Sequence, residues 1–315
     1  MKAAVVTDFG GPEKVEIRDL PRPDPGAGEV LVRQRASSLN PLDWKLRRGR
    51  LRFVMRVRVP AVLGFDVAGT VEAVGSGVTR FAPGDEVFGG SWGGAHAEFV
   101  AVPEGFLARK AGCLSFEESA AGAGSSLTAL VALRDVAHVG PAQHVLVNGG
   151  TGGVGSAAVR ISRALGARVT ATGGPGSGDF LRELGAERAL DYTGDDFAAG
   201  NDRYDVIFDA ANASTFWRAA RVLSPKGIYV TTMPGPGPFL AALGARLAGL
   251  FGYRKRCGWV IVKPGTAGLE SLAKLAGEAK VRPAIDSIFP LERIREAHER
   301  LESGHPRGKV VVAIG

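Results

Sequence analysis

Cysteine is scarce in this chain, and long apolar runs are missing. Cys113 and Cys257 are the two cysteines among 315 residues, and they lie far apart without a C-x-x-C pair. A disulfide framework or a structural zinc site is therefore not expected, and both side chains are interpreted as reduced thiols of a cytosolic protein. The longest apolar stretch, Pro238–Phe251, contains Arg246 and is shorter than the roughly 20 residues that span a bilayer.

The N-terminus lacks the pattern of a secretory signal peptide and leads straight from Met1 into an apparent strand. We therefore expect a cytoplasmic protein without a transmembrane segment. The net charge of +7 comes largely from the basic segment Lys45–Arg58. It is interpreted as a solvated loop and edge strand, or as a surface that attracts an anionic cofactor, lipid or RNA. No interleaved aromatic residues or nucleic-acid motif accompany it, so no nucleic-acid partner is expected.

A glycine-rich turn is the most specific motif of the chain. The apolar run Val145–Val147 leads into Gly150-x-Gly152-x-x-Gly155, and a helical pattern follows over Ser156–Leu165. A dinucleotide pyrophosphate site needs this order, because glycines permit a tight turn and the helix N-terminus offers free N–H groups. The predicted cofactor contacts of this turn are Gly150, Gly152, Gly153, Val154 and Gly155.

Two kinds of pattern divide the chain, and its length favours two domains. The first third has short strand-like segments punctuated by proline and glycine, as in a compact antiparallel barrel. Helical patterns begin near Ser115, as Phe116–Ala121 and Leu127–Asp135, and βαβ alternation then predicts a doubly wound parallel sheet. The last apolar strand, Lys309–Ile314, is predicted to return to the first domain.

Several segments together resemble the medium-chain dehydrogenase/reductase superfamily, in particular its zinc-free quinone oxidoreductase branch, over essentially the whole chain. They include SLNPLDWK at 38–45, PAVLGFDVAGTVEAVG at 60–75, the glycine turn, and HPRGKVV at 305–311. The resemblance implies an α/β fold: a GroES-like β-barrel catalytic domain, residues 1–122 and 265–315, with an inserted Rossmann dinucleotide-binding domain, residues 123–264. It also places the active site in a cleft between these domains.

The resemblance bears on metal binding as well. Zinc members of the superfamily carry a Gly-His-Glu segment and an upstream cysteine as catalytic ligands. This chain has Leu63-Gly-Phe-Asp66 instead, with Asn40 near the cysteine position. No metal site is therefore expected, and alcohol dehydrogenation with zinc as a Lewis acid is disfavoured.

Cofactor choice follows from the second strand of the predicted Rossmann domain. An NAD-preferring domain usually has an acidic residue there that binds the ribose 2′-hydroxyl, but the tip over 170–177 has no carboxylate. Related reductases hold the 2′-phosphate with a Lys or Arg, a Ser or Asn, and the Tyr of a D-Y motif. Ser177 and Tyr192 match this pattern, whereas Gly176 stands at the expected cation. NADPH is the expected cofactor, with NADH as a competitor.

The predicted reaction is hydride transfer from NADPH to a quinone or an α,β-unsaturated carbonyl, without a metal and with the last proton from solvent. Asn40, Lys45 and Thr128 are the candidate catalytic residues. Their alternatives are a turn cap, a solvated lysine and a helix cap, respectively. The alternative function is an NADPH-binding adaptor or sensor with little catalysis.

Further cofactor contacts are predicted at the carboxyl ends of later strands and before the last strand. Rossmann folds bind ligands at such ends, and Arg307 suits a bidentate phosphate contact, with a surface turn as the alternative. These candidates are Ala210, Asn212, Thr232, Met233, His305 and Arg307. A homodimer through a strand at Trp259–Lys263 is plausible. The apolar and basic segment Pro234–Arg256 is interpreted as a substrate-site cover, a subunit interface or a membrane-surface helix.

Overall fold

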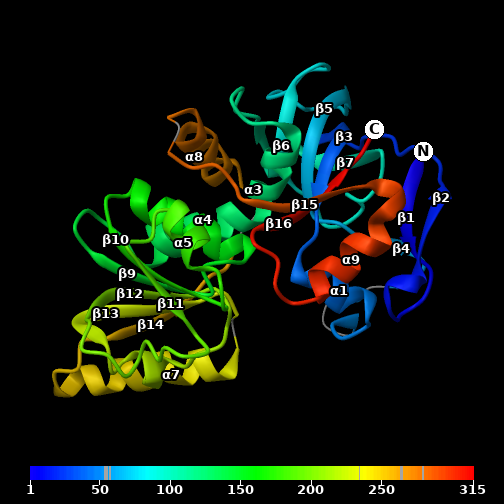
Figure 1. Cartoon of the computed structure of the whole chain (residues 1–315). Helices are drawn as coiled ribbons and strands as arrows, with labels where there is room; N and C mark the ends of the chain where they lie inside the picture. Colours follow the sequence, from blue (N-terminus) through cyan, green and yellow to red (C-terminus); the bar gives the residue numbers. More distant parts are fainter. Residues whose placement is uncertain (53–55, 57, 234, 263–264, 279) are drawn as a thin grey trace. The chain divides into compact units, whose positions relative to one another are not determined.

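The computed structural model describes residues 1–52, 56, 58–233, 235–262, 265–278 and 280–315, which form two compact units (Figure 1). Unit 1 comprises Met1–Gly124, Pro264–Glu278 and Arg282–Gly315, and unit 2 comprises Ser125–Lys263 and Ala279–Val281. Three predicted segments lie partly outside the described residues. These are Lys45–Arg58 at residues 53–55 and 57, Pro234–Arg256 at residue 234, and Trp259–Lys263 at residue 263.

Unit 1 is built on a seven-stranded sheet in the order β15-β16-β3-β5-β6-β8, with β7 also pairing with β3. The neighbours are antiparallel except for β15 and β16. The strands are β3 (Glu29–Ser38), β5 (Asp66–Val74), β6 (Glu86–Gly90), β7 (Phe99–Pro103), β8 (Leu107–Arg109), β15 (Ile285–Pro290) and β16 (Lys309–Ala313). A second sheet joins β1 (Lys2–Val6), β2 (Val15–Asp19) and β4 (Ala61–Val62).

The last strand of the chain lies in the sheet of the first third. In β16, Val311 pairs with Ser38 and Ala313 with Ala36 of β3. The predicted return of this strand is therefore confirmed. The fold thereby brings Lys309 beside the end of β3, although nearly the whole chain separates them in sequence.

The helices of unit 1 include α1 (Pro41–Arg47), α8 (Thr266–Gly277) and α9 (Ile294–Glu302). A loop and edge strand were expected over Lys45–Arg58. This prediction is wrong for Lys45–Arg47, which form the end of α1. Pro41 suits the first helical position, and the Asp43 carboxylate accepts the Asn40 backbone N–H at 2.7 Å, so a helix starts here.

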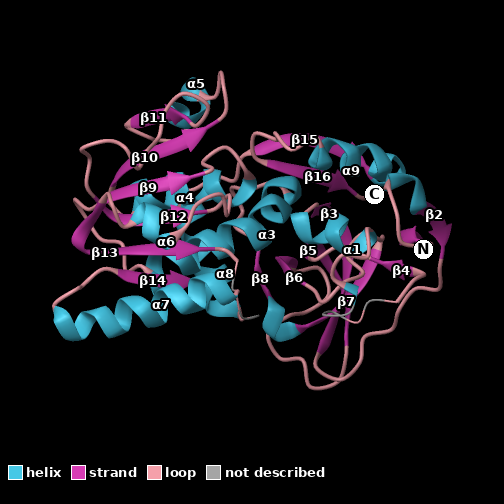
Figure 2. Ribbon diagram, turned by 90° about the horizontal axis from the view of Figure 1, so that it is seen from below, coloured by secondary structure: helices cyan, strands magenta, loops and turns pink. Residues whose placement is uncertain are grey.

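Unit 2 contains a six-stranded sheet in the order β11-β10-β9-β12-β13-β14, parallel throughout (Figure 2). The predicted doubly wound sheet is confirmed, with α4 and α5 on one side and α7 on the other (Figure 1). The strands are β9 (His144–Asn148), β10 (Arg168–Gly173), β11 (Arg188–Asp191), β12 (Tyr204–Asp209), β13 (Leu223–Thr231) and β14 (Arg256–Trp259). The helices are α4 (Gly153–Ala164), α5 (Gly178–Glu183), α6 (Phe216–Ala219) and α7 (Pro236–Ala248).

Some predicted elements differ from the structure. The two helices expected around 116–121 and 127–135 are one helix, α3 (Phe116–Leu130), followed by a π-helical segment, Val131–Val136. Thr128 thus lies in the last turn of α3 and does not start a helix. The strand expected at Trp259–Lys263 is β14, which ends at Trp259 because its partner β13 ends at Thr231.

Helix α7 has one buried and one exposed apolar face. Ala241 and Ala245 are buried, whereas Leu240, Leu243 and Leu247 are exposed. The small residues let α7 pack closely along β14, which it contacts. Within the described part of the chain, no helix is long and apolar enough to cross a bilayer.

Candidate functional site

The glycine turn of unit 2 joins β9 to α4. Strand β9 ends at Asn148, Gly149 adopts φ +82°, and Gly152 is the N-cap of α4. The Gly150 N–H donates to the Thr172 carbonyl at 2.7 Å, which ties the turn to the end of β10. The predicted order of strand, turn and helix is present, with the helix starting at Gly153.

The three motif glycines differ in what surrounds them. A Cβ on Gly155 would lie 2.0 Å from the Gly149 carbonyl oxygen, so α4 packs directly on the turn. A Cβ on Gly150 would lie 2.9 Å from Leu181 Cδ2. A Cβ on Gly152 would meet nothing within 4 Å. Gly155 is therefore required by packing and Gly150 is closely packed, whereas Gly152 leaves open space at a helix N-terminus, where phosphate groups bind.

Buried polar groups beneath the turn fix three strand ends to one another. Asn148 Nδ2 donates to Asp209 Oδ1 at 2.8 Å, and its Oδ1 accepts from the Thr172 hydroxyl at 2.8 Å. The Thr172 oxygen in turn accepts the Gly149 N–H at 2.9 Å. Asp209, which is fully buried, also accepts from the Tyr229 hydroxyl at 2.8 Å. Burial, together with this carboxylate, raises the pKa of Tyr229, so the phenol stays protonated and donates.

The tip of β10 carries the residues predicted to choose the cofactor. The buried Ser177 hydroxyl donates to the Gly174 carbonyl at 2.6 Å, so its proton is used within the turn. The Tyr192 ring lies over Gly174, with its hydroxyl 3.1 Å from where a Gly174 Cβ would stand, and is 53% exposed. Tyr192 is therefore a half-exposed side chain at the tip with its hydroxyl beside Gly174, whereas the buried Ser177 stabilises the turn itself.

A guanidinium lies beside this tip, although Gly176 occupies the position where the sequence pattern expects a cation. Arg182 Nη1 would lie 3.4 Å from a Cβ on Gly178, directly after Ser177. The same nitrogen donates to Asp179 Oδ1 at 2.9 Å, and both side chains are exposed. Spacing alone missed Arg182, because it reaches back along α5 from one turn further on.

The predicted contacts after β12 and β13 lie at the same sheet edge as the glycine turn. Asn212, at φ +54°, donates from Nδ2 to Thr232 Oγ1 at 2.7 Å and accepts from the Thr231 hydroxyl at 2.6 Å. Ala210 donates its N–H to the Asn148 carbonyl at 3.0 Å, and Met233 is 51% exposed. Parallel pairing brings these strand ends together, at the edge where open α/β sheets bind ligands.

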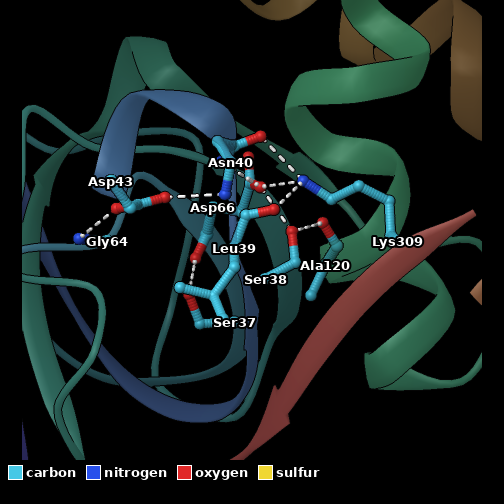
Figure 3. A network of polar contacts seen from close by, with 9 residues as sticks. All are labelled: Ser37, Ser38, Leu39, Asn40, Asp43, Gly64, Asp66, Ala120 and Lys309. Carbon is cyan, nitrogen blue, oxygen red and sulfur yellow. Dashed lines mark hydrogen bonds and ion pairs between the residues drawn. The ribbon is translucent and has the colours of Figure 1, made fainter. Parts of the chain in front are cut away.

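A second polar cluster lies in unit 1 around Asn40, at the end of β3 (Figure 3). Asn40 Nδ2 donates to Asp66 Oδ2 at 2.8 Å, and Lys309 Nζ donates to Asn40 Oδ1 at 2.7 Å. Lys309 Nζ also donates to the Leu39 carbonyl at 2.8 Å and lies 3.2 Å from Asp66 Oδ2. The Ser38 hydroxyl donates to the same Asp66 oxygen. We call Ser38, Asn40, Asp66 and Lys309 the Asn40 network.

Asp43 supports the Asn40 network from α1. Its Oδ1 accepts the Gly64 N–H at 3.1 Å, and its Oδ2 accepts the Asn40 N–H. The carboxyl is fully buried, and this burial raises its pKa. Asp43 thus fixes the chain direction at Asn40.

The other predicted residues of unit 1 lie in different surroundings. Lys45 is half-buried on α1, with Nζ 5.7 Å from the Trp44 ring centroid. His305 and Arg307 are exposed in the loop before β16, where the Arg307 N–H donates to Asp286 Oδ1 at 2.7 Å. Asn40 is therefore the predicted catalytic residue of unit 1 that the fold ties into a buried polar network.

Lys309 and Asp66 were missed as functional candidates. The available signal was a lysine at the start of an apolar strand and an acid between Phe65 and Val67. Both side chains are buried, Lys309 at 5% and Asp66 at 2% exposure. A buried charge requires a partner of opposite charge. Lys309 and Asp66 each therefore predict that such a partner exists, but the sequence does not identify it.

Comparison with known proteins assigns the family. A model described as an alcohol dehydrogenase GroES-like domain matches residues 26–112, and one described as a zinc-binding dehydrogenase matches residues 184–312. The chloroplast envelope quinone oxidoreductase homolog of Arabidopsis thaliana is 33% identical over 315 residues, covering 96% of this chain and 95% of that protein. The chloroplastic NADPH-dependent alkenal/one oxidoreductase of the same plant is 31% identical over 328 residues, covering 99% and 79%.

A solved structure agrees with these relatives. The quinone oxidoreductase from Coxiella burnetii superposes with a TM-score of 0.90 at 31% identity, covering 100% of this chain and 99% of that one. The chain belongs to the medium-chain dehydrogenase/reductase superfamily, in its quinone-oxidoreductase-like branch. The GroES-like and Rossmann folds implied by the sequence are thereby confirmed.

The description of one family model includes zinc, but the donors of the Asn40 network do not suit that metal. Zinc prefers thiolate, imidazole and carboxylate ligands. Asp66 supplies one carboxylate, and its Oδ2 already faces the Lys309 ammonium. Within the described ranges, no group of three or more His, Cys, Asp or Glu side chains is placed to hold a metal ion. The donor set of the Asn40 network therefore does not suit a zinc site.

Proposed function

We propose that the chain is an NADPH-dependent oxidoreductase that transfers a hydride, without a metal, to a quinone or an α,β-unsaturated carbonyl. The open space at Gly152, in front of the α4 N-terminus, carries the cofactor part of this proposal. Membership of the quinone-oxidoreductase-like branch supports the reaction, because the two plant relatives are named for quinone and alkenal/one reduction.

NADPH rather than NADH is proposed because of the charges at the end of β10. The turn over 173–178 carries no carboxylate that would repel a 2′-phosphate. Tyr192 lies half exposed there with its hydroxyl beside Gly174, and Arg182 supplies a guanidinium that suits phosphate geometry. An NADPH-dependent relative supports this choice.

The residues of this chain bind, orient and stabilise. When bound, the nicotinamide supplies the hydride. The Gly150–Gly155 turn holds the pyrophosphate at the α4 N-terminus, and Asn212, Thr232 and Met233 lie further along the same sheet edge. Asn40 is proposed to donate an amide N–H to the acceptor oxygen, where negative charge develops during hydride transfer. Lys45, Thr128, His305 and Arg307 are proposed as additional ligand contacts.

A homodimer is part of the proposal. Strand β14 is the last of the six in its sheet, so its outer edge has no strand partner within the described residues. Ile261 and Val262, two and three residues after its end, are exposed. An unpaired edge next to apolar side chains favours pairing with a second chain.

The test is turnover of purified protein with NADPH against a panel of quinones and enones. NADPH oxidation that depends on acceptor concentration supports the function. A Gly152→Val variant is expected to fold and to lose both NADPH binding and turnover, because its side chain fills the open space. Gly112→Ala is the matched control, since a Cβ there also meets nothing within 4 Å but lies in unit 1. No turnover of any acceptor by the wild-type protein would refute the proposal.

A further inference from the structure

Lys309 has a bonding environment that is unusual for a lysine. It starts β16, is followed by three valines, and is 5% exposed. Its ammonium has three N–H groups and three acceptors, namely the Leu39 carbonyl at 2.8 Å, Asn40 Oδ1 at 2.7 Å and Asp66 Oδ2 at 3.2 Å. No donor capacity is left for solvent or substrate, so Lys309 acts through its partners.

Net stability is a weak reason for such a pair. The cost of desolvating two charges commonly cancels their attraction, and apolar residues of similar volume often give equal or greater stability. What the pair does determine is the orientation of one neutral group. Lysine can only donate and a carboxylate can only accept, so the Asn40 oxygen must face Lys309 and its nitrogen must face Asp66.

Among the side-chain donors of the Asn40 network, one N–H remains without an acceptor among the described residues. Ser38 and Lys309 donate every side-chain proton they have, and Asp66 has none to give. The half-buried Asn40 uses one N–H on Asp66 and keeps the other, which has no acceptor among the described residues. The ammonium on Oδ1 draws electron density from the amide, which strengthens the remaining N–H as a donor.

We infer that Lys309 is a positioning residue, which with Asp66 locks and polarises the Asn40 amide so that its free N–H is presented to the acceptor oxygen of the substrate. The inference rests on the proposed reductase function for the identity of the acceptor. The lock itself is a property of the Asn40 network alone.

The first experiment compares three variants in the complete enzyme. Lys309→Met keeps an unbranched side chain that is one atom shorter and removes the charge; kcat for a quinone is expected to fall about 10- to 100-fold, with KM for NADPH nearly unchanged. Asp66→Asn combined with Lys309→Met removes both buried charges and is expected to recover thermal stability but not kcat. A purely structural ion pair would recover both, and that outcome would overturn the inference.

Lys110→Met is the matched control for the loss of a buried lysine. Lys110 belongs to the same unit, its side chain is 6% exposed, and Nζ donates to the Leu114 carbonyl at 2.8 Å while pairing with Glu86. Its contacts do not include Asn40, so kcat is expected to stay at the wild-type value. An equal fall of kcat in Lys110→Met and Lys309→Met would also overturn the inference.

Chemical rescue separates charge from volume. Lys309→Ala leaves space for a small primary ammonium ion, and n-propylammonium is expected to restore kcat in a saturable way, whereas tetramethylammonium, which has no N–H, is not. Absence of rescue, together with wild-type kcat in Lys309→Met, would refute a role for the ammonium.

A readout without turnover distinguishes failure of this inference from failure of the proposed function. The two side-chain amide protons of Asn40, assigned by their loss in Asn40→Ala, are expected to give widely separated NMR signals in the wild-type protein, because one binds a carboxylate. In Lys309→Met the two signals are expected to shift and move closer together. Unchanged signals would refute the lock even if the enzyme reduces quinones, and changed signals would support it even if no acceptor is found.

Discussion

At the scale of single residues, two glycines of the turn have different roles: Gly155 is needed for packing, whereas Gly152 is proposed to leave room for the cofactor. Gly155→Ala is expected to destabilise the protein by several kcal/mol, on the order of other overpacked sites, because the new Cβ would meet the Gly149 carbonyl oxygen at 2.0 Å. Gly152→Ala is expected to leave the urea midpoint nearly unchanged while weakening NADPH binding. Urea unfolding and a fluorescence titration with NADPH measure the two effects. Equal destabilisation by both variants would contradict this division.

Two buried imidazoles predict how stability depends on pH. Burial lowers the pKa of His96 and lowers that of His298 well below its usual range, and the latter is also repelled by His96 and Arg47. Above about pH 6.5 both imidazoles are neutral in the folded and unfolded states. Below it the unfolded chain binds protons that the folded chain does not, so stability falls by up to ~1.4 kcal/mol per pH unit for each imidazole.

His298→Leu is expected to reduce this fall, measured as the urea midpoint between about pH 7.5 and pH 5. Replacement of the exposed His138 by Gln serves as the control and leaves the slope unchanged. The buried Asp43, whose pKa is raised, binds its proton more readily in the folded state and opposes the trend at lower pH. A slope that His298→Leu does not alter would contradict the assignment.

Arg182 and Asp179 predict a shift in cofactor preference. Arg182→Gln is expected to weaken NADPH binding about tenfold with little change for NADH, because one charge-assisted contact to the 2′-phosphate is lost. Asp179→Asn frees the guanidinium and is expected to strengthen NADPH binding. Arg163→Gln is the control, since Arg163 is also an exposed, ion-paired arginine of unit 2 but lies at the opposite end of α4 from the glycine turn. Dissociation constants for both cofactors decide the question.

At the scale of elements, the two faces of α7 have different energetic roles. Ala245, which is buried on the packed face, tolerates no larger side chain, so Ala245→Leu is expected to cost about 1–3 kcal/mol. Leu247 is 56% exposed, and Leu247→Gln is expected to change stability by less than about 0.5 kcal/mol. Urea unfolding of the two variants compares the faces. A large loss in Leu247→Gln would show that something covers the exposed face.

Elements with strong local signals were predicted from sequence. Strand β9 extends the predicted apolar run Val145–Val147 by one residue at each end. Helix α4 begins three residues before and ends one residue before the predicted range Ser156–Leu165, and both elements were found because an apolar run, glycines and helical periodicity coincide there. Helix α1 was missed, since Lys45 and Arg47 belong to a basic segment that was interpreted as a loop, and the start of this short helix depends on Asp43. Strand β14 was displaced, because its bounds are set by pairing with β13 and not by its own sequence. Local chemistry can be predicted from sequence, whereas register depends on a partner.

At the scale of the whole molecule, the free edge of β14 predicts association. The Val260 N–H donates to Thr231 of β13, so backbone alternation turns the Ile261 N–H toward the free edge. Ile261→Pro, which removes this donor, is expected to convert a homodimer into a monomer in sedimentation velocity. Ile261→Val keeps the donor and is expected to remain dimeric. A wild-type monomer at all concentrations would refute the proposed dimer.

The polar groups around the glycine turn of unit 2 were predicted from sequence more completely than the Asn40 network of unit 1. The glycine turn and the strand ends follow from one contiguous βαβ pattern. Lys309 and Asp66 are 243 positions apart, and no single stretch of sequence indicates that they meet. Asp209 was likewise not predicted as part of the site, although it anchors Asn148 beneath the turn. Pairwise chemistry between distant residues depends on the fold.

The pairing of β16 with β3 imposes an order on biosynthesis. Most of unit 2, from Ser125 onward, is continuous in sequence and can fold while the ribosome is still translating. Strand β3 must wait for β16, which is translated after all of unit 2, and Lys309 arrives with it. The nascent protein is therefore expected to acquire its Rossmann unit first and to leave Asp66 without its counter-ion until β16 has been made.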